Sequence, residues 1–126
     1  RIYDYGRVGA DGKPRQLHID KAVEVTNLCP AKPYPQTESF EENGAVKRLL
    51  SKCEYFTVYS VDVEKEASFN ADEASFHNIL ILEGEAVLKC GGEVLQLKKG
   101  DSVFVPAGCG EYSLMGTFKS VFTRID

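Results

Sequence analysis

Short strand-like segments recur about every ten residues from Val46 to the end of the chain, and this repetition limits the fold more than any other feature. The segments are rich in Val, Ile, Tyr, Phe and Thr, which pack well on a pleated surface. Breaks that contain glycine or proline separate them, among them Glu83-Gly84-Glu85, Gly91-Gly92, Pro106-Ala107-Gly108 and Met115-Gly116. Closing such a sheet removes its exposed edges. The pattern predicts a mainly β fold of about seven or eight short antiparallel strands, closed as a jelly roll or barrel.

The first 35 residues have a different pattern. Residues 1–7 alternate apolar and polar side chains, which predicts a half-buried strand. Apolar residues spaced by three and four positions predict a short amphipathic helix over 19–27. Three prolines within 30–35 favour an extended connector. We therefore divide the chain into an amino-terminal segment, 1–35, and a strand-rich domain, 46–126.

Charge and hydropathy exclude two classes of partner. The chain of 126 residues carries 15 Lys and Arg against 19 Asp and Glu, a net charge of −4. Nucleic-acid binding requires a concentrated basic surface, and the sequence contains no Lys/Arg-rich run. No apolar stretch reaches the length of a membrane span, about 18 residues. We expect neither nucleic-acid nor membrane partners.

The cysteines indicate the cellular compartment rather than a site. They are Cys29, Cys53, Cys90 and Cys109. Their spacing gives no Cys-x-x-Cys pair, so it suggests neither zinc binding nor dithiol chemistry, and we expect reduced, mostly buried core residues. No leader pattern opens the sequence, which favours a cytoplasmic location. Because the sequence begins at Arg1 and its one methionine is Met115, we expect it to be a fragment of a longer protein.

Residues 79–114 resemble a cupin, a small jelly-roll domain. The likeness rests on the segments LEGEAVL and GDSVFVPAG. In the second segment Gly100, Pro106 and Gly108 match the spacing of a cupin motif. Glycine permits the tight turn and the positive φ that such a reversal needs, and proline ends a strand because it has no N–H to donate. The resemblance implies a double-stranded antiparallel jelly roll.

Many cupins bind a metal through three histidines and a glutamate, but the matching positions here hold other residues. The glutamate position falls on His77 and the last histidine position on Glu111. The paired histidine positions fall on Asn70 and Asp72, or, with a shorter spacing, on Ala71 and Glu73. One imidazole and two carboxylates can hold iron or manganese, which leaves an independent metal-dependent cupin enzyme open. The preferred interpretation is that His77 makes a hydrogen bond at a strand start and that Glu111 is a solvated rim residue. We therefore predict no metal ligand in this chain.

Both parts of the chain resemble type I mannose-6-phosphate isomerases. The segment RIYDYGRVGADGKPRQLHIDKAVEV is similar to a motif block of these enzymes, and CEYFTVYSVDV and KKGDSVFVPAGCGEYSLMG are similar to their carboxyl-terminal cupin. The resemblance implies a zinc-dependent aldose–ketose isomerase that interconverts mannose 6-phosphate and fructose 6-phosphate. The zinc ligands of the family lie in its amino-terminal cupin, and neither histidine of this sequence matches one of them.

The resemblance assigns one active-site position, because Arg1 matches the family's active-site arginine. It also implies that the partner of this chain is the missing amino-terminal catalytic cupin, that the substrate is a sugar phosphate, and that the fragment alone is inactive. Arg7, Lys13 and Arg15 are interpreted as solvated turn charges, although attraction of a sugar phosphate is left open. An alternative function is a stand-alone cupin that binds a sugar or small acid without catalysis.

Overall fold

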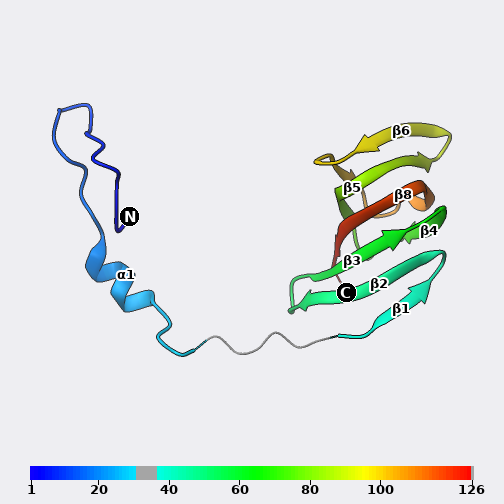
Figure 1. Cartoon of the computed structure of the whole chain (residues 1–126), viewed down its shortest axis with the longest axis horizontal. Helices are drawn as coiled ribbons and strands as arrows, with labels where there is room; N and C mark the ends of the chain where they lie inside the picture. Colours follow the sequence, from blue (N-terminus) through cyan, green and yellow to red (C-terminus); the bar gives the residue numbers. More distant parts are fainter. Residues whose placement is uncertain (31–36, 126) are drawn as a thin grey trace. The chain divides into compact units, whose positions relative to one another are not determined.

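The structure is a computed structural model that describes residues 1–30 and 37–125 (Figure 1). Its elements are α1 (Ile19–Val25), β1 (Ser39–Glu42), β2 (Ala45–Lys52), β3 (Thr57–Val63), β4 (Glu66–Ala71), β5 (His77–Cys90), β6 (Glu93–Lys98), β7 (Ser102–Val105) and β8 (Gly110–Arg124). The chain divides into two compact units, Arg1–Tyr34 and Pro35–Asp126. Within the described residues, no helix has the length and apolar character needed to cross a bilayer. The predicted mainly β, antiparallel fold with one short helix is confirmed.

The predicted strand over residues 1–7 is wrong, because the chain reverses within it. The N–H of Arg7 donates to the carbonyl of Asp4 across 2.9 Å. Between them Tyr5 and Gly6 both have positive φ, 53° and 67°, as the two central residues of a type I′ turn do. An apolar–polar alternation therefore does not become a strand where the backbone turns. Within residues 1–30, the β-pairing is one isolated bridge between Val8 and Pro14.

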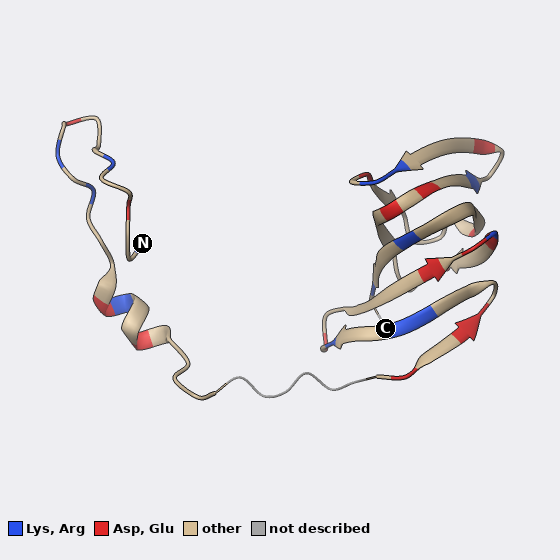
Figure 2. Ribbon diagram, viewed as in Figure 1, with Lys and Arg blue, Asp and Glu red and all other residues tan. Residues whose placement is uncertain are grey.

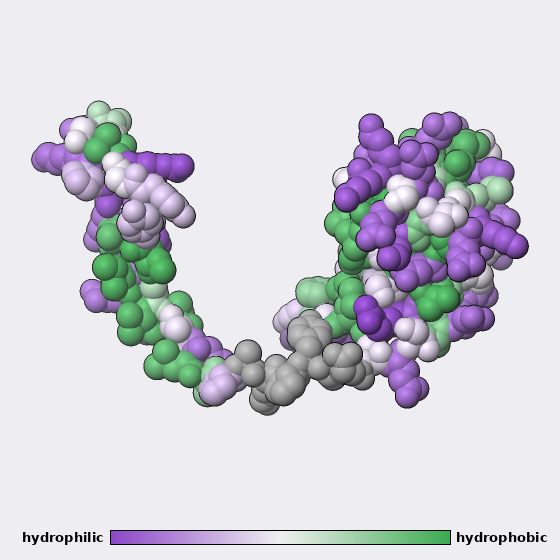
Figure 3. All heavy atoms as spheres, in the orientation of Figure 1, coloured by the Kyte–Doolittle hydropathy of each residue, from purple (hydrophilic) through white to green (hydrophobic). Residues whose placement is uncertain are grey.

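The helix predicted over 19–27 forms as α1, and it ends earlier, at Val25. Thr26 is already extended, with a ψ of 124°, which ends the helix. None of the seven residues of α1 is buried, and hydrophobic atoms are visible over its surface in Figure 3. Most of the proline-rich connector predicted over 30–35 lies outside the described residues.

The second unit is one antiparallel sheet built around two long strands, β5 and β8. Along the main path the order is β1-β2-β3-β8-β5-β6 (Figure 1). β8 pairs with β4 through its first half and with β3 through its second half. β5 pairs with β7 through its first half and with β6 through its second half. Each long strand therefore has a different neighbour along each of its two halves, in addition to the pairing of β5 with β8.

Two strand breaks expected from the sequence do not exist, because β5 continues through Gly84 and β8 continues through Gly116. Both glycines have positive φ, and a Cβ atom on Gly84 would lie 2.1 Å from the carbonyl oxygen of Thr117. The glycines bend the strands and let the two backbones approach closely, so pairing is not interrupted. The strands also begin at Ser39, before the expected start near Val46, and β4 was not anticipated.

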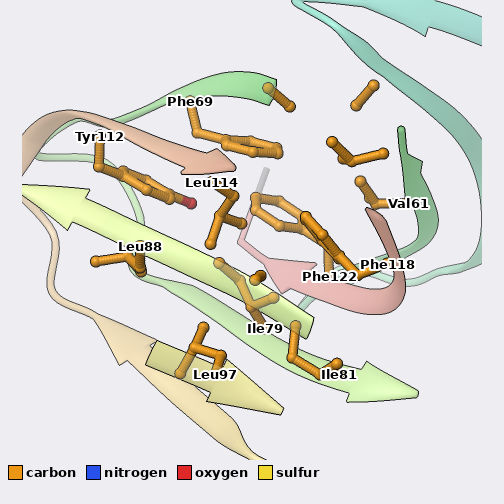
Figure 4. Close-up of a cluster of buried hydrophobic side chains, with 14 of the residues drawn as sticks. Val61, Phe69, Ile79, Ile81, Leu88, Leu97, Tyr112, Leu114, Phe118 and Phe122 are labelled. Carbon is orange, nitrogen blue, oxygen red and sulfur yellow. The ribbon is translucent and has the colours of Figure 1, made fainter. Parts of the chain in front are cut away.

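The core of the second unit is formed by buried side chains from β2 through β8, and Figure 4 shows members from β3, β4, β5, β6 and β8. Its largest fully buried apolar residues are Ile79, Ile81, Leu114 and Val61. The cysteines were predicted to be mostly buried in the core, and this prediction is wrong. Three of them are exposed and Cys90 is half-buried. Cys53 and Cys109 lie in turns, where the backbone follows the surface.

Candidate functional site

The first unit brings Arg1 together with two side chains that the sequence analysis did not connect to it. The carboxylate of Asp4 accepts a hydrogen bond from Nε of Arg15 at 2.7 Å and pairs with Nη2 of the same guanidinium. Nε of Arg1 lies 3.8 Å from Oδ1 of Asp4, the oxygen that also pairs with Nη2 of Arg15. The Asp4 carboxylate therefore faces two guanidinium groups, and that of Arg15 is paired in the bidentate geometry that arginine favours.

Backbone contacts hold Arg1 in this position. Its Nη1 donates to the carbonyl of Gln16 at 3.0 Å, and its own carbonyl accepts from the N–H of His18 at 2.7 Å. In the described part of the chain, this leaves four of the five guanidinium N–H groups without a hydrogen bond. The side chain remains 34% exposed. Arg1 is thus oriented by its neighbours and still able to donate to a ligand.

The charges of this cluster are fixed over the physiological pH range. The hydrogen bond from Arg15 lowers the pKa of Asp4, desolvation opposes this shift, and the charges of Arg15 and Arg1 lower the pKa further. The same hydrogen bond raises the pKa of Arg15. Two cations share one anion, so the cluster has a net positive charge. Such a cluster can stabilise a negative or polarised oxygen.

Three basic residues of this segment were predicted to be solvated turn charges, and the prediction holds for two of the three. Arg7 and Lys13 are exposed, as predicted. Figure 2 shows the basic residues of the first unit as blue segments of its ribbon. Arg15 is half-buried in the ion pair with Asp4, so the prediction is wrong for this residue. The partners are 11 positions apart in the sequence, and the intervening reversal at Asp4–Arg7 and bridge at Val8–Pro14 bring them together. The sequence offered no pattern that indicates this pair.

The second unit contains a buried histidine at the position where a cupin could hold a metal. His77 begins β5 and is 4% exposed, and its Nδ1 lies 2.8 Å from the hydroxyl of Tyr112 in β8. The predicted hydrogen bond of His77 at a strand start is confirmed. Burial, together with the charges of Arg124 and Lys47, lowers the pKa of His77 to about 4. His77 is therefore a neutral core residue at pH 7.

The structure does not gather the alternative metal ligands Asp72, His77 and Glu111. Asp72 and Glu111 are exposed, whereas His77 is buried. Oδ1 of Asp72 accepts from the N–H of Ala74 at 2.9 Å, which holds this carboxylate in its own turn. Among the described residues, no group of three or more His, Cys, Asp or Glu is placed to hold a metal ion. The described part of this chain therefore does not fit the zinc that the resemblance implies for the full-length enzyme.

Aromatic side chains fill the space around His77. The ring of Phe69 stacks on those of Tyr112 and Phe122, with centroids 5.3 and 5.6 Å apart (Figure 4). Nζ of Lys47 lies over Phe69, 5.3 Å from the ring centroid, and pairs with the carboxylate of Glu42. This cation–π arrangement was not predicted. The ammonium group of Lys47 covers the aromatic stack, and the carboxylate of Glu42 neutralises its charge.

Comparisons with known proteins connect both units to one family. Residues 46–125 match the family model described as mannose-6-phosphate isomerase, cupin domain. Two proteins of Bacillus subtilis (strain 168), "Putative mannose-6-phosphate isomerase YvyI" and "Mannose-6-phosphate isomerase ManA", are each 33% identical over 99% of this chain. A crystal structure of the mannose 6-phosphate isomerase from Bacillus subtilis superimposes with a TM-score of 0.77 at 32% identity and covers 98% of this chain.

The chain spans 39% of the length of these relatives. The similarity includes the first unit as well as the jelly roll, since it extends over nearly the whole chain. The predicted cupin fold and the predicted family are both confirmed. This chain belongs to the mannose-6-phosphate isomerase family, and its second unit contains the family's cupin domain.

Proposed function

We propose that this chain is the carboxyl-terminal part of a zinc-dependent enzyme that interconverts mannose 6-phosphate and fructose 6-phosphate. The observation that carries the proposal is the 33% identity to two proteins named as mannose-6-phosphate isomerases, which extends over 99% of the chain. The relatives are longer than this chain, so the remaining portion of the protein is the partner that would complete the active site. The proposal includes a cytoplasmic location for the full-length protein.

The chemistry of the reaction explains why Arg1 would be needed. Interconversion of an aldose and a ketose moves a proton between C1 and C2 through an enediolate, so negative charge develops on an oxygen atom of the sugar. A guanidinium remains protonated throughout and can donate two parallel hydrogen bonds to such an oxygen. The free N–H groups of Arg1 would stabilise this charge more strongly in the transition state than in the substrate.

Asp4 and Arg15 would act as positioning residues for Arg1. The bidentate pair with Arg15 fixes the Asp4 carboxylate, and that carboxylate lies 3.8 Å from Nε of Arg1. The carbonyl of Gln16 fixes the opposite end of the guanidinium. A guanidinium held on two sides loses little conformational freedom when it binds a substrate, which favours catalysis by preorganisation.

Zinc, on this proposal, is held by the portion of the enzyme outside this chain, because the described residues do not offer a ligand group. This chain would supply Arg1, and its jelly roll would pack on the catalytic portion and help to exclude water from the sugar phosphate. The 126-residue chain alone is then inactive. Isomerisation of mannose 6-phosphate by the purified chain without its partner would contradict this division.

The experiment that tests the proposal uses the full-length protein and substitutions numbered as in this chain. Arg1→Gln should lower kcat for mannose 6-phosphate by about 100-fold or more, with a smaller change in KM, because the lost interaction forms mainly in the transition state. Arg1→Lys should restore part of kcat, since it returns the charge without the planar fork. Arg7→Gln, at an exposed arginine, is the matched control and should leave kcat unchanged. A kcat for Arg1→Gln within twofold of the wild-type value would overturn the assignment of Arg1.

The alternative, a binding module without catalysis, can be tested with the same chain. The interior of the jelly roll, where such a ligand would bind, is occupied by His77, Phe69, Tyr112 and Phe122. Calorimetric titration of the 126-residue chain with mannose 6-phosphate should therefore show no saturable binding to the barrel. Saturable binding that persists in Arg1→Gln and is lost on Lys47→Ala would favour the binding module.

A further inference from the structure

Two cysteines from distant parts of the sequence meet at one end of the jelly roll. Cys90 is the last residue of β5, and Cys109 lies in the turn that precedes β8. Their Sγ atoms are 2.7 Å apart, although 19 positions separate them in the sequence. Both are free thiols, Cys90 half-buried and Cys109 exposed. The pair is therefore close enough to react and open to a small oxidant.

The surrounding backbone holds the two sulfur atoms at this distance. Cys90 is paired in register with Tyr112 between β5 and β8. Cys109 is held by its N–H, which donates to the carbonyl of Pro106 at 3.2 Å, and the adjacent N–H of Gly108 donates to the carbonyl of Asp72 at 2.8 Å. Before Cys109, a hydrogen bond to Asp72 fixes the turn. After Cys109, the pairing of β8 with β5 fixes the backbone. A bond between the thiols would require little movement of the backbone.

We propose that Cys90 and Cys109 form a reversible intramolecular disulfide, a redox modification site at the end of the jelly roll. The oxidant is a low-molecular-weight disulfide. The thiolate of the exposed Cys109 attacks one sulfur of that disulfide, forms a mixed disulfide and releases one thiolate. Cys90 then attacks the Sγ of Cys109, the bond to the small thiol breaks, and the second small thiolate leaves. Two protein thiols are oxidised by two electrons, the small disulfide is reduced to two thiols, and the two protons pass to the leaving groups.

The hydrogen bond to Cys109 raises the pKa of the Cys90 thiol, so the first attack is assigned to the more exposed partner. The cross-link would close a loop of about 20 residues that contains β6 and β7, and a loop of this size restricts the unfolded chain substantially. Oxidation is therefore expected to stabilise the second unit without changing its fold.

Oxidised glutathione is the probe for the test, applied to the 126-residue chain after reduction and removal of the reductant. Of the 4 cysteine thiols, two should become unreactive toward a thiol reagent. The intact mass should fall by about 2 Da, as expected for an intramolecular disulfide formed without an adduct. A peptide map should contain Cys90 linked to Cys109. Oxidation should raise the Tm of the second unit by about 10 °C, and reduction should reverse the increase.

Cysteine variants separate this pair from general thiol oxidation. Cys53→Ser is the matched control, since Cys53 is exposed in the same unit without a cysteine partner among the described residues, and it should leave the cross-link and the Tm increase intact. Cys109→Ser and Cys90→Ser should each abolish both. Retention of all four thiols in the wild-type chain, stable glutathione adducts in place of the cross-link, or dimers linked through Cys53 would each overturn the proposal. Because oxidised and reduced wild-type chains are compared directly, the test does not depend on the folding of a variant.

Discussion

The two units of this chain contain similar apolar residue types and use them differently. In the second unit, Ile79 and Ile81 are almost completely inaccessible, and side chains from neighbouring strands close around them (Figure 4). In the first unit, Ile19 of α1 is 52% exposed and Val23 is 68% exposed. A helix of seven residues is too short to be stable by local interactions alone. The second unit therefore owes its stability to burial, whereas the first unit is held by turns, an ion pair and few apolar contacts.

This difference corresponds to two separate contributions to the proposed enzyme. The second unit supplies a rigid scaffold and, at one end, a pair of thiols. The first unit supplies an oriented guanidinium with free donors. On the proposed function, the apolar residues that are exposed on α1 would pack against the rest of the enzyme, and such packing would help to order Arg1. Three of the four experiments below compare the two units directly, and the pH experiment tests the buried core of the second unit.

The largest effect is expected from one substitution made at two isoleucines. Ile79→Ala should lower the free energy of unfolding of the second unit by about 4 kcal/mol, because it removes fully buried methyl groups and leaves a cavity. Ile19→Ala in α1 should change the same quantity by less than about 0.5 kcal/mol. Urea denaturation of the 126-residue chain measures both values. Equal losses for the two variants would show that the first unit is part of the same cooperative core.

The second comparison concerns glycines with positive φ. Gly84→Ala should destabilise the second unit by about 3 kcal/mol, because the new Cβ would meet the carbonyl oxygen of Thr117 in a backbone conformation that alanine avoids. Gly91→Ala is the control, since its φ is positive but no atom lies within 4 Å, and it should cost about 1 kcal/mol. Gly6→Ala in the first unit should leave this transition unchanged. Similar values for Gly84→Ala and Gly91→Ala would contradict the close approach of β5 and β8.

A third comparison uses pH. The pKa of His77 is about 4 in the folded state, against 6.5 when exposed, so between these values the unfolded chain binds the additional proton. The stability that depends on neutral His77 is complete above pH 6.5 and is lost as the pH falls toward 4. At pH 5 the loss should be about 2 kcal/mol. His77→Gln, which keeps a polar partner for Tyr112, should remove this part of the pH dependence, and an unchanged profile would contradict the assignment.

The smallest effect on the second unit is expected from the charge cluster of the first. Asp4→Asn removes the anion that pairs with Arg15 and lies near Arg1, so the amino-terminal segment should open more often and be cleaved severalfold faster by trypsin after Arg15. The Tm of the second unit should not change. Asp11→Asn is the matched control, because Asp11 only accepts a backbone hydrogen bond from Lys13 within its turn. Equal cleavage rates for the two variants would show that the ion pair does not order the segment.

Local features of the backbone could be predicted from the residues that produce them. Gly100 and Gly108 have positive φ, 91° and 76°, at the turns where glycine was expected to allow it. The helix was placed correctly from its apolar spacing, and the hydrogen bond of His77 from its position at a strand start. In each case neighbouring residues contain the cause, since a turn or a short helix depends mainly on the conformational preferences of a few adjacent positions.

The predictions that failed depend on contacts between distant positions. Alternation over residues 1–7 reports which side chains share a face, but not that the backbone reverses at Tyr5–Gly6. The glycines in β5 and β8 resemble turn residues, and only the partner strand shows that they permit close approach. Buried cysteines were expected from their average behaviour, whereas the position of Cys109 before β8 places it at the surface.

From residue types and their spacing alone, the chain was predicted to be mainly β with one short helix near its amino terminus, and its motifs indicated its family and Arg1. These features follow from local chemistry, in which each residue restricts its own backbone and its near neighbours. The pairing of Asp4 with Arg15, the contact of Cys90 with Cys109 and the burial of His77 against Tyr112 required the folded structure. They arise when strand register and turns bring distant segments together, and no short stretch of sequence contains that information.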